Sequence, residues 1–346
     1  MYDSQRIVTP SQIGPIEGSY RRMSSLPNSA AFPLSTLAVV MEKPEHLRLS
    51  RLDLTAPGDD DIVVDMEWTG ISTGTEKLLW FGRMPPFPGL GYPLVPGYES
   101  VGRVSHAGAN CGRQVGERVF VPGARCYGEV RGLFGGASSK VVVPGARVTP
   151  IDEKLGEQGV LLALAATAYH AVAAKNAIHP DLIIGHGVLG RLISRIAALN
   201  QSEPAPVVWE RNPTRAQGAV GYSVIDPTSD TRKDYRSIYD VSGDSSLLDT
   251  LISRLGPGGE VVLAGFYDTL TFSFPAAFMK EARIRIAAEW RESDLHAVKQ
   301  LVESGRLNLD GLITHRHEAT EAQSAYATAF NDPNCLKMIL DWRAHS

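Results

Sequence analysis

The chain of 346 residues is 43% hydrophobic and 21% charged, which is typical of a globular protein of about two domains. Its net charge of −4 and its lack of any Lys/Arg-rich run exclude a nucleic-acid-binding protein, so no nucleic-acid partner is expected. The three cysteines, Cys111, Cys126 and Cys335, are widely spaced and form no C-x-x-C pair. This indicates a reducing compartment and excludes a four-cysteine structural zinc site.

Residues 1–36 are rich in Ser and Pro and contain no apolar stretch long enough for a signal peptide or a membrane span. We therefore expect a disordered N-terminal extension, with Met23 as an alternative start of translation. No integral membrane segment is expected, because the rest of the chain shows no membrane anchor either.

Residues 37–155 are predicted to form a twisted, barrel-like β domain. Short apolar runs alternate with turn formers such as Lys43-Pro44 and Pro57-Gly58, a pattern typical of strands joined by tight turns. The predicted strands lie within residues 37–42, 47–54, 61–70, 99–108, 117–123 and 138–144.

Residues 156–292 are predicted to form a doubly wound parallel sheet, which gives the whole chain an α/β fold class. Helical patterns over 157–175 and 191–200 alternate with six short apolar runs. These runs lie within 181–187, 207–210, 223–226, 237–243, 261–266 and 283–290. The C-terminal segment, 293–346, contains two amphipathic helices and a final strand, and we expect it to return to the β domain.

The sequence Gly185-His186-Gly187-Val188-Leu189-Gly190 is a G-x-G-x-x-G loop between a predicted strand and a predicted helix. Gly185 permits the tight turn, Gly187 lets a pyrophosphate approach the backbone, and Gly190 lets the helix pack closely on the strand. Val188 and Leu189 are candidate cofactor residues within the loop, and the N-terminus of the helix that follows would hold the phosphates. The loop therefore predicts a Rossmann dinucleotide site; the alternative is a glycine-rich turn without a ligand.

Glu210 follows the second predicted strand, 210 − 190 = 20 residues after the last glycine, where an acid that binds the ribose is expected. A carboxylate there accepts both ribose hydroxyls and repels a 2′-phosphate, which favours NAD over NADP. The adjacent Arg211 weakens this preference. Ser242 at the end of a strand, and Gly265 and Phe266 after the next, are predicted to lie near the nicotinamide.

Residues 70–104 carry the glycine skeleton of a medium-chain dehydrogenase active site, G-I-C-G-T-D followed by P-G-H-E-x-x-G-x-V. Ser72 stands where this skeleton has its zinc cysteine, and Tyr98 where it has its zinc histidine. The third zinc ligand of that superfamily lies four residues before the threonine of T-x-Y, and here that position is Ala163. A hydroxyl and a phenol are poor zinc ligands, so we expect no metal.

Together with Gly116-Glu117-Arg118-Val119 and Thr167-Ala168-Tyr169, these motifs resemble the medium-chain dehydrogenase/reductase superfamily over residues 37–346. That resemblance implies a GroES-like catalytic domain, a Rossmann cofactor domain and a cofactor contact by Thr167. The string from Ile71 to Val104 looks like the zinc-free bacteriochlorophyllide a dehydrogenases of bacteriochlorophyll biosynthesis. This implies NAD-dependent oxidation of the 3-(1-hydroxyethyl) group of a chlorophyllide or bacteriochlorophyllide to 3-acetyl.

Residues 80–92 form a proline-stiffened aromatic loop that suits a large flat substrate such as a tetrapyrrole. Arg83 is a candidate partner for a propionate carboxylate. The alternative is that these side chains only pack the loop onto the β domain. The candidate substrate residues are Trp80, Phe81, Arg83, Met84, Phe87 and Tyr92.

Alcohol oxidation without zinc needs other groups to hold the hydroxyl and to take its proton. Ser72 and Thr75 are candidate hydroxyl donors in a proton relay, and Glu76, Glu99 or Tyr98 is the candidate base. Glu99 has an alternative structural role, in which it bridges backbone amides within its own turn. Tyr98 has one as well, in which it only fills the vacated ligand position.

Two other functions stay open at this point: a zinc-free quinone or enoyl reductase that uses NADPH, and a tetrapyrrole carrier without catalysis. Glu210 argues against the first, and retention of Thr75, Glu76 and Glu99 against the second. By analogy with the superfamily we expect a homodimer. The expected location is the cytoplasm, with the apolar substrate permitting peripheral contact with the photosynthetic membrane.

Overall fold

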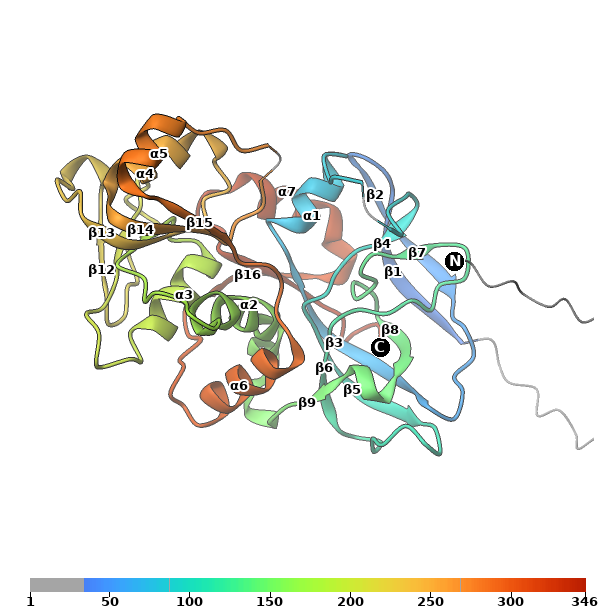
Figure 1. Cartoon of the computed structure of the whole chain (residues 1–346). Helices are drawn as coiled ribbons and strands as arrows, with labels where there is room; N and C mark the ends of the chain where they lie inside the picture. Colours follow the sequence, from blue (N-terminus) through green and yellow to red (C-terminus); the bar gives the residue numbers. More distant parts are fainter. Residues whose placement is uncertain (1–33, 87, 268) are drawn as a thin grey trace, which may run out of the picture. The chain divides into compact units, whose positions relative to one another are not determined.

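The computed structural model describes residues 34–86, 88–267 and 269–346 (Figure 1). The extension predicted for the N-terminus therefore falls almost wholly outside the described residues, as does Phe87 of the aromatic loop. The first strand, β1, starts at Ser35, two residues before the predicted start. None of the helices in the described ranges is long and apolar enough to cross a membrane.

Two sheets make up the β-rich part. A four-stranded sheet has the order β2 (His46–Asp53), β1 (Ser35–Lys43), β4 (Leu94–Val95) and β7 (Arg131–Gly132). A seven-stranded sheet has the order β16 (Ile313–Glu318), β17 (Lys337–Asp341), β3 (Asp61–Ile71), β5 (Ser100–Ala107), β6 (Arg118–Val121) and β9 (Thr149–Pro150), and β8 (Lys140–Pro144) pairs with β3. An antiparallel bridge between Ala38 and Ser138 connects the two sheets, which gives the predicted barrel-like arrangement.

The third sheet is parallel throughout and has the order β12 (Ser223–Ile225), β11 (Val207–Trp209), β10 (Leu182–Ile184), β13 (Tyr235–Asp240), β14 (Leu255–Leu263) and β15 (Arg283–Ile286). Its order reverses at β10, which is the switch point where doubly wound sheets bind their ligands. The sequence prediction of a six-stranded, doubly wound parallel sheet is therefore confirmed.

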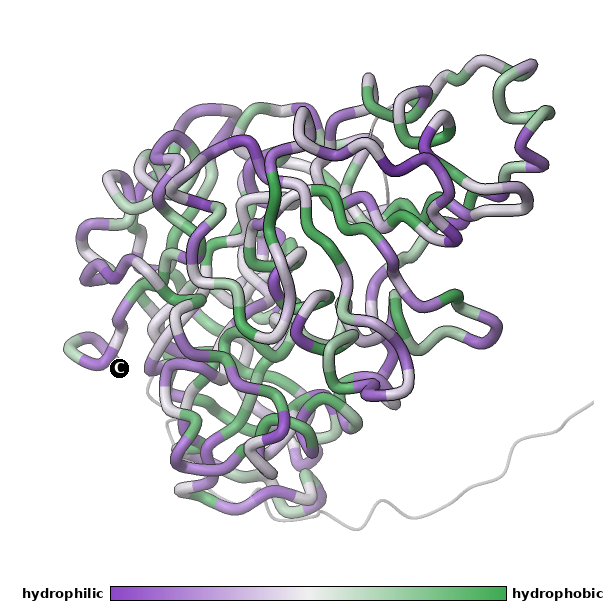
Figure 2. Tube along the Cα trace, turned by 90° about the vertical axis from the view of Figure 1, so that its left-hand side faces the viewer, coloured by the Kyte–Doolittle hydropathy of each residue, from purple (hydrophilic) through white to green (hydrophobic). Residues whose placement is uncertain are grey.

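Helices cover both faces of the parallel sheet. Alternate strand residues point to opposite sides, and those on each side are buried against a different set of helices. Ile183, Val208 and Tyr239 share a buried cluster with residues of α2 (Leu162–Ala173), α3 (Val188–Ala197) and α6 (Glu292–Glu303). Leu182 and Ile238 share another with residues of α4 (Leu248–Arg254) and α5 (Phe274–Lys280). In Figure 2 green hydrophobic stretches run through the interior of the trace, and purple hydrophilic stretches are common on the outer loops.

The helix predicted over 157–175 begins differently in the structure. Residues Glu153–Leu161 form 3-10 turns, and α2 proper begins only at Leu162. The reason is local: Gly156 lies at φ 48°, outside the helical region, and the side chain of Asp152 accepts a hydrogen bond from the Lys154 amide at 2.8 Å. These turns lead the chain from the seven-stranded sheet to the parallel sheet.

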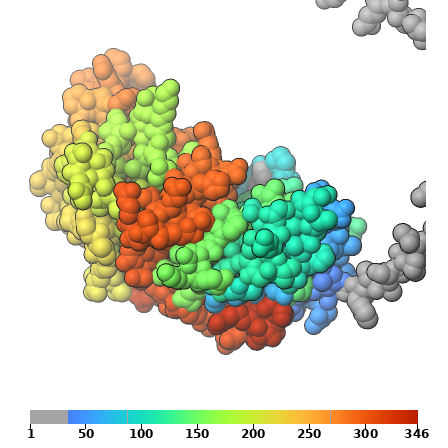
Figure 3. All heavy atoms as spheres, turned by 90° about the horizontal axis from the view of Figure 1, so that it is seen from below, coloured from blue at the N-terminus to red at the C-terminus, as the bar shows by residue number. Residues whose placement is uncertain are grey.

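The C-terminal segment adds β16 and β17 to the seven-stranded sheet. Helix α6 packs on α2, and Figure 3 shows the orange-to-red C-terminal residues against the green residues around α2. Strand β17 then pairs antiparallel with β3, with Met338 opposite Ile71. Helix α7 (Ala322–Asn331) packs against β17 and also lies near β2. This arrangement places α7 and the start of β17 beside the end of β3.

Candidate active site

Three hydroxyl groups meet where β3 ends. Ser72 follows β3, Thr75 begins the short helix α1 (Thr75–Trp80), and Tyr98 lies in the turn before β5. The Ser72 Oγ is 2.8 Å from the Tyr98 hydroxyl oxygen, and the Thr75 Oγ1 is 3.3 Å from it. We call Ser72, Thr75 and Tyr98 the hydroxyl triad. The structure thus brings together three of the five candidate catalytic residues in direct contact.

The phenol of Tyr98 remains a hydrogen-bond donor in this environment. Burial of its hydroxyl and the neighbouring Glu99 carboxylate raise the pKa of Tyr98 above its usual value, against the hydrogen bonds from Ser72 and Thr75. The ring lies edge-on to Phe134, with 5.3 Å between the ring centroids. The raised pKa keeps the phenol protonated, so Tyr98 offers no phenolate as a base and is suited to donate a hydrogen bond.

Glu76 lies behind the triad and is completely buried. Its Oε1 accepts a hydrogen bond from the Ser72 amide at 3.1 Å, and its Oε2 accepts one from the Tyr326 hydroxyl of α7 at 2.5 Å. Burial raises the pKa of Glu76 to about 7, although the hydrogen bonds from Tyr326 and Ser72 act in the opposite direction. A carboxyl group with such a pKa is able to take up a proton near neutral pH.

Glu99 is also completely buried, but it has a different partner. Its Oε2 accepts a hydrogen bond from Lys337 Nζ at 2.6 Å, and the same ammonium donates to the Ile71 carbonyl at 3.0 Å. The side chain pairs with this lysine rather than with the backbone amides of its own turn. Gly70 leaves the space for it, since a Cβ at that position would lie 2.4 Å from Glu99 Oε2.

Lys337 and Tyr326 are the two residues of this cluster that the sequence analysis missed. Both lie in the C-terminal segment, 238 residues from Glu99 in one case and 250 from Glu76 in the other. No local motif marks them. The only available signal was a lysine at the start of a strand whose next three residues are apolar.

The residues at the three former ligand positions do not fit zinc. Two of them, Ser72 and Tyr98, offer hydroxyl oxygens, and the third, Ala163, offers a buried methyl group. Within the described ranges, no three His, Cys, Asp or Glu side chains come together as a possible metal site. Structural and catalytic zinc sites use thiolates, imidazoles and carboxylates, so this donor set does not support a zinc-dependent step.

The aromatic loop divides into a packed part and an exposed part. Trp80, Met84 and Tyr92 pack against the core of the β-rich sheets, with the Trp80 ring 6.4 Å from that of Phe330 and the Tyr92 hydroxyl bonded to the Leu79 carbonyl. Arg83 is exposed, and its guanidinium lies over the Phe81 ring at 5.5 Å. Arg83 is therefore the exposed candidate of this loop, and Phe81 lies half-buried beneath it.

The glycine loop has the geometry that a dinucleotide site requires. Gly185 has φ 97°, which favours glycine, and a Cβ on Gly190 would lie 2.0 Å from the Gly185 carbonyl oxygen. A Cβ on Gly187 would meet nothing within 4 Å, so the backbone there is open to an approaching pyrophosphate. Helix α3 begins at Val188, three residues before the predicted start at Arg191, so that Val188 and Leu189 lie in its first turn.

Beside the loop is a cavity of about 530 Å³, a volume in the range of small-molecule and cofactor sites. Glu210 holds two of the surrounding amides: its Oε2 accepts from His186 at 3.2 Å and its Oε1 from Asn212 at 2.8 Å. The residues that line the cavity include Gly185, Glu210, Arg211, Thr228, Ser242 and Arg254. The residues present fit the adenosine half of a dinucleotide.

A second set of contacts, which the sequence did not indicate, fixes the loop after Glu210. His186 is fully buried, with Nδ1 2.5 Å from the Arg215 carbonyl and Nε2 2.7 Å from the Tyr222 hydroxyl. Burial lowers the pKa of His186 to about 4, so the ring is neutral. Arg191 of α3 donates to the His186 carbonyl and to three carbonyls of this loop, those of Arg215, Gln217 and Gly218.

The remaining candidate cofactor residues lie at the carboxyl ends of the central strands and on α2. The Ser242 amide donates to Asp240 Oδ1 at 2.9 Å. Gly265 lies beside Tyr267, since a Cβ there would be 2.8 Å from the Tyr267 hydroxyl oxygen, and Phe266 is 48% exposed. Thr167 is half-buried on α2 and donates to the Ala163 carbonyl at 3.1 Å.

Residues 58–153 match the family described as the alcohol dehydrogenase GroES-like domain. The 2-desacetyl-2-hydroxyethyl bacteriochlorophyllide A dehydrogenase of Rhodobacter capsulatus is 56% identical over 312 residues, which cover 90% of this chain and 99% of the relative. The enzyme of the same name from Cereibacter sphaeroides is 56% identical over 317 residues, which cover 90% of this chain and 99% of that relative. The chain belongs to this dehydrogenase family.

Membership in the bacteriochlorophyllide A dehydrogenase family confirms the predicted superfamily, the GroES-like and Rossmann fold class, and an oxidoreductase activity. Among solved structures, an alcohol dehydrogenase from Escherichia coli CFT073 complexed with NADH has a TM-score of 0.75 and 22% identity, with 89% of this chain and 99% of that chain covered. At that identity the likeness shows the fold. A nicotinamide cofactor agrees with the family and with the glycine loop.

Proposed function

We propose that the chain oxidises the 3-(1-hydroxyethyl) group of a bacteriochlorophyllide-type tetrapyrrole to 3-acetyl, with NAD+ as the hydride acceptor and without zinc. The relatives named for this activity are 56% identical along nearly their whole length. The single observation that carries the zinc-free mechanism is the contact between Ser72 and Tyr98, at 2.8 Å, in the two positions where a ligand pair would stand.

In this mechanism the hydroxyl triad binds the substrate hydroxyl in place of a metal. The Tyr98 phenol donates a hydrogen bond to the alcohol oxygen and stabilises negative charge that develops on it. The substrate proton passes through the Ser72 hydroxyl to Glu76, whose Oε1 is already bonded to the Ser72 amide at 3.1 Å. When bound, the cofactor supplies the acceptor for the hydride that leaves the carbinol carbon.

Glu76 is the base of choice for a physical reason. Because burial raises the pKa of Glu76 to about 7, its protonated and ionised forms are both populated near neutral pH. Glu99 instead accepts from Lys337 at 2.6 Å, so we assign it no proton transfer. Conjugation of the hydroxyethyl carbon with the macrocycle makes its hydride easier to remove, which reduces the need for a Lewis acid.

We assign cofactor preference to Glu210 and substrate contact to the aromatic loop. Glu210 borders the cavity beside the glycine loop, where its charge disfavours a 2′-phosphate and supports NAD over NADP.

Phe81 and Arg83 would meet the macrocycle and a propionate, and Trp80, Met84 and Tyr92 would hold the loop in place. Phe87, the sixth candidate, lies outside the described residues.

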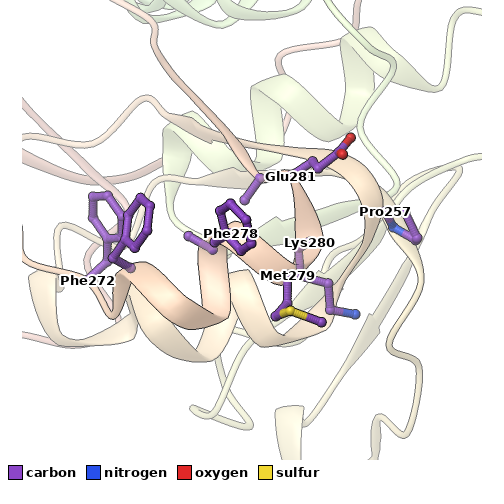
Figure 4. Close-up of a pocket in the computed structure, with 9 residues that line it drawn as sticks. Pro257, Phe272, Phe278, Met279, Lys280 and Glu281 are labelled. Atoms are coloured by element: carbon purple, nitrogen blue, oxygen red, sulfur yellow. The ribbon is translucent and has the colours of Figure 1, made fainter.

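We also infer a homodimer formed through the edge of the parallel sheet. Among the described residues, no strand pairs with the outer edge of β15, and large apolar side chains are exposed beside it. Those on and just before α5 line a cavity of about 610 Å³, and Figure 4 shows Phe278 and Met279 on α5 together with Phe272 just before it. The exposed apolar residues are Phe272, Phe274, Phe278, Met279, Ile284 and Ile286.

Sedimentation velocity tests this assembly. The wild-type protein is expected to sediment as a dimer, and the variant Phe278→Glu/Ile286→Lys as a monomer with unchanged circular dichroism. Val115→Lys, which alters another exposed apolar residue in the catalytic part, is the matched control and should remain dimeric. A wild-type monomer at micromolar concentration would contradict the proposal.

The functional division along the chain is part of the same proposal. Residues 37–155 and 293–346 would form the catalytic part, because β16 and β17 complete the sheet that carries Ser72. Residues 156–292 would bind the cofactor. We place the enzyme in the cytoplasm at the periphery of the photosynthetic membrane, on the ground that its substrate is apolar; cell fractionation tests this location.

The first experiment mixes chelator-treated protein with a 3-hydroxyethyl bacteriochlorophyllide and NAD+ and records the visible spectrum. Conversion to the acetyl group extends conjugation, so the long-wavelength band should shift to the red as NADH forms. Loss of turnover on metal removal, with recovery on zinc addition, would contradict the zinc-free mechanism. Pigment binding without a shift would support the carrier instead.

A further inference from the structure

The ion pair between Lys337 and Glu99 lies directly behind the hydroxyl triad. Of the ion pairs between described residues, it alone has both side chains at most 2% exposed. The ammonium makes two contacts, 2.6 Å to Glu99 Oε2 and 3.0 Å to the Ile71 carbonyl oxygen. Ile71 precedes Ser72 and Glu99 follows Tyr98. One cation therefore ties together the two chain segments that carry the closest hydroxyl pair of the triad.

We propose that Lys337 is a positioning residue for this reaction: its ammonium holds the Ser72 and Tyr98 sides of the hydroxyl triad at a fixed separation. This inference rests on the proposed function. Catalysis by oriented groups is sensitive to small displacements, and a shift of about 1 Å in such a group costs about 100-fold in rate. In place of a metal bound by both segments, the structure has a buried lysine bound to both.

The surroundings of the pair support a fixed geometry. Glu99 Oε1 has no hydrogen-bond partner among the described residues, so the lysine supplies the carboxylate's only charged contact. Gly70 has no side chain that would move Glu99 away, and its amide donates to the Glu99 carbonyl at 2.7 Å. Met338, next to Lys337 on β17, pairs with Ile71 on β3, so the strand register sets the position of the ammonium.

The test uses the full chain with both charges removed, because Lys337→Met alone would leave a buried carboxylate unpaired and would destabilise the fold. Lys337→Met/Glu99→Gln is the first variant and Lys337→Arg, which keeps both hydrogen bonds, is the second. The matched control is Arg118→Met/Glu67→Gln, which removes a partly buried ion pair of 2.8 Å from the same sheet. For each protein the melting temperature, NAD+ affinity, kcat and pigment KM are measured.

A positioning role predicts a lower kcat, by about 10-fold or more, for Lys337→Met/Glu99→Gln, with NAD+ affinity and pigment KM close to wild type. Lys337→Arg should restore kcat to at least half of the wild-type value, and the control should leave kcat unchanged. A folded double variant with kcat within about twofold of wild type would overturn the inference. So would a stable Lys337→Arg enzyme that remains as slow as the double variant.

Failure of the proposed function is recognised separately. Wild-type turnover of the hydroxyethyl pigment is measured first, and its absence would overturn the proposed function together with this role of Lys337. Wild-type turnover with an unaffected double variant would overturn the role of Lys337 alone.

Discussion

The hydroxyl oxygens of Ser72 and Tyr98 are 2.8 Å apart, although the two residues are 26 positions apart in the chain. Each occupies a position where the related sequence skeleton carries a metal ligand. The two sides of the site have therefore stayed together while the chemistry of their side chains has changed from metal binding to hydrogen bonding. A hydroxyl pair of this kind can hold an alcohol oxygen, but it cannot act as a Lewis acid.

Replacing Tyr98 with Phe should slow the chemical step. The substitution removes the donor to the alcohol oxygen, and loss of one such donor typically costs about 100-fold in kcat. NAD+ affinity should not change, because the phenol lies at the triad and not at the glycine loop. Stopped-flow measurement of NADH formation in a single turnover would isolate this step.

Tyr127→Phe is the matched control for Tyr98→Phe. Its hydroxyl is also buried and is bonded to the Gly135 carbonyl and to Ser138, but it does not contact the triad. We expect a loss of stability of about 1 kcal/mol without a change in kcat. If both variants lose activity equally, the effect at Tyr98 is one of stability.

Glu76→Gln should abolish the rise of activity with pH. Because burial raises the pKa of Glu76 to about 7, the wild-type kcat is expected to increase through pH 7 as the carboxylate forms. The glutamine cannot take the proton, so kcat should fall by about 100-fold or more and become independent of pH in this range. A wild-type profile that is flat between pH 6 and pH 8 would assign the proton to another group.

The same substitution has a predicted effect on stability. The folded-state pKa of Glu76, about 7, is above the unfolded value of 4.5, so the folded state binds the proton more tightly. The contribution of Glu76 to the free energy of unfolding is fully present below pH 4.5 and is lost as the pH rises through 7. The free energy of unfolding changes by about 3 kcal/mol over this range. Urea unfolding at several pH values should show that the free energy of unfolding falls less with rising pH for Glu76→Gln than for wild type.

Glu210→Ala should relax the rejection of NADP. The carboxylate accepts from the His186 and Asn212 amides at 3.2 and 2.8 Å, so its removal also loosens the loop, and the affinity for NAD+ should fall as well. The ratio of kcat/KM for NAD+ to that for NADP+ is therefore the informative measurement. An unchanged ratio would show that Glu210 does not set the cofactor preference.

Arg83→Ala should raise the KM for a pigment with a free propionate by about 10-fold, because a charge-assisted hydrogen bond is lost. The methyl ester of the same pigment provides the control, since it carries no charge for Arg83 to meet. Wild-type and variant enzymes should treat the ester alike. If the KM values for acid and ester change together, Arg83 acts through packing on Phe81, over which it lies at 5.5 Å.

The glycine loop between a strand and a helix was predictable because its signals are local. Gly185, Gly187 and Gly190 lie within one short loop, where Gly185 has a positive φ and Gly190 has no room for a Cβ, while Gly187 leaves the backbone open. Glu210 was placed by its spacing from them and by the end of a strand. The loop beyond it was not predictable, because the contacts of Arg191 are with backbone carbonyls, which leave no trace in sequence.

The candidate catalytic residues were identified by comparison with a known skeleton, and their arrangement was not. Sequence reasoning left Glu76, Glu99 and Tyr98 open as candidate bases and offered a structural role as the alternative for Glu99. The structure separates the two carboxylates, because α7 brings Tyr326 to Glu76 and β17 brings Lys337 to Glu99. These partners come from a segment more than two hundred residues away, and only the folded chain decides which carboxylate each one meets.

The sequence by itself determined the class of the fold, the dinucleotide loop and the replacement of the zinc ligands, because strand periodicity, glycine positions and residue identities are properties of short segments. The tertiary structure alone decided that Ser72, Thr75 and Tyr98 touch, that Glu76 is buried enough for its pKa to reach about 7, and that Lys337 joins two strands behind them. Burial and long-range contact depend on how the sheets close, and a linear sequence does not contain that information in any one place.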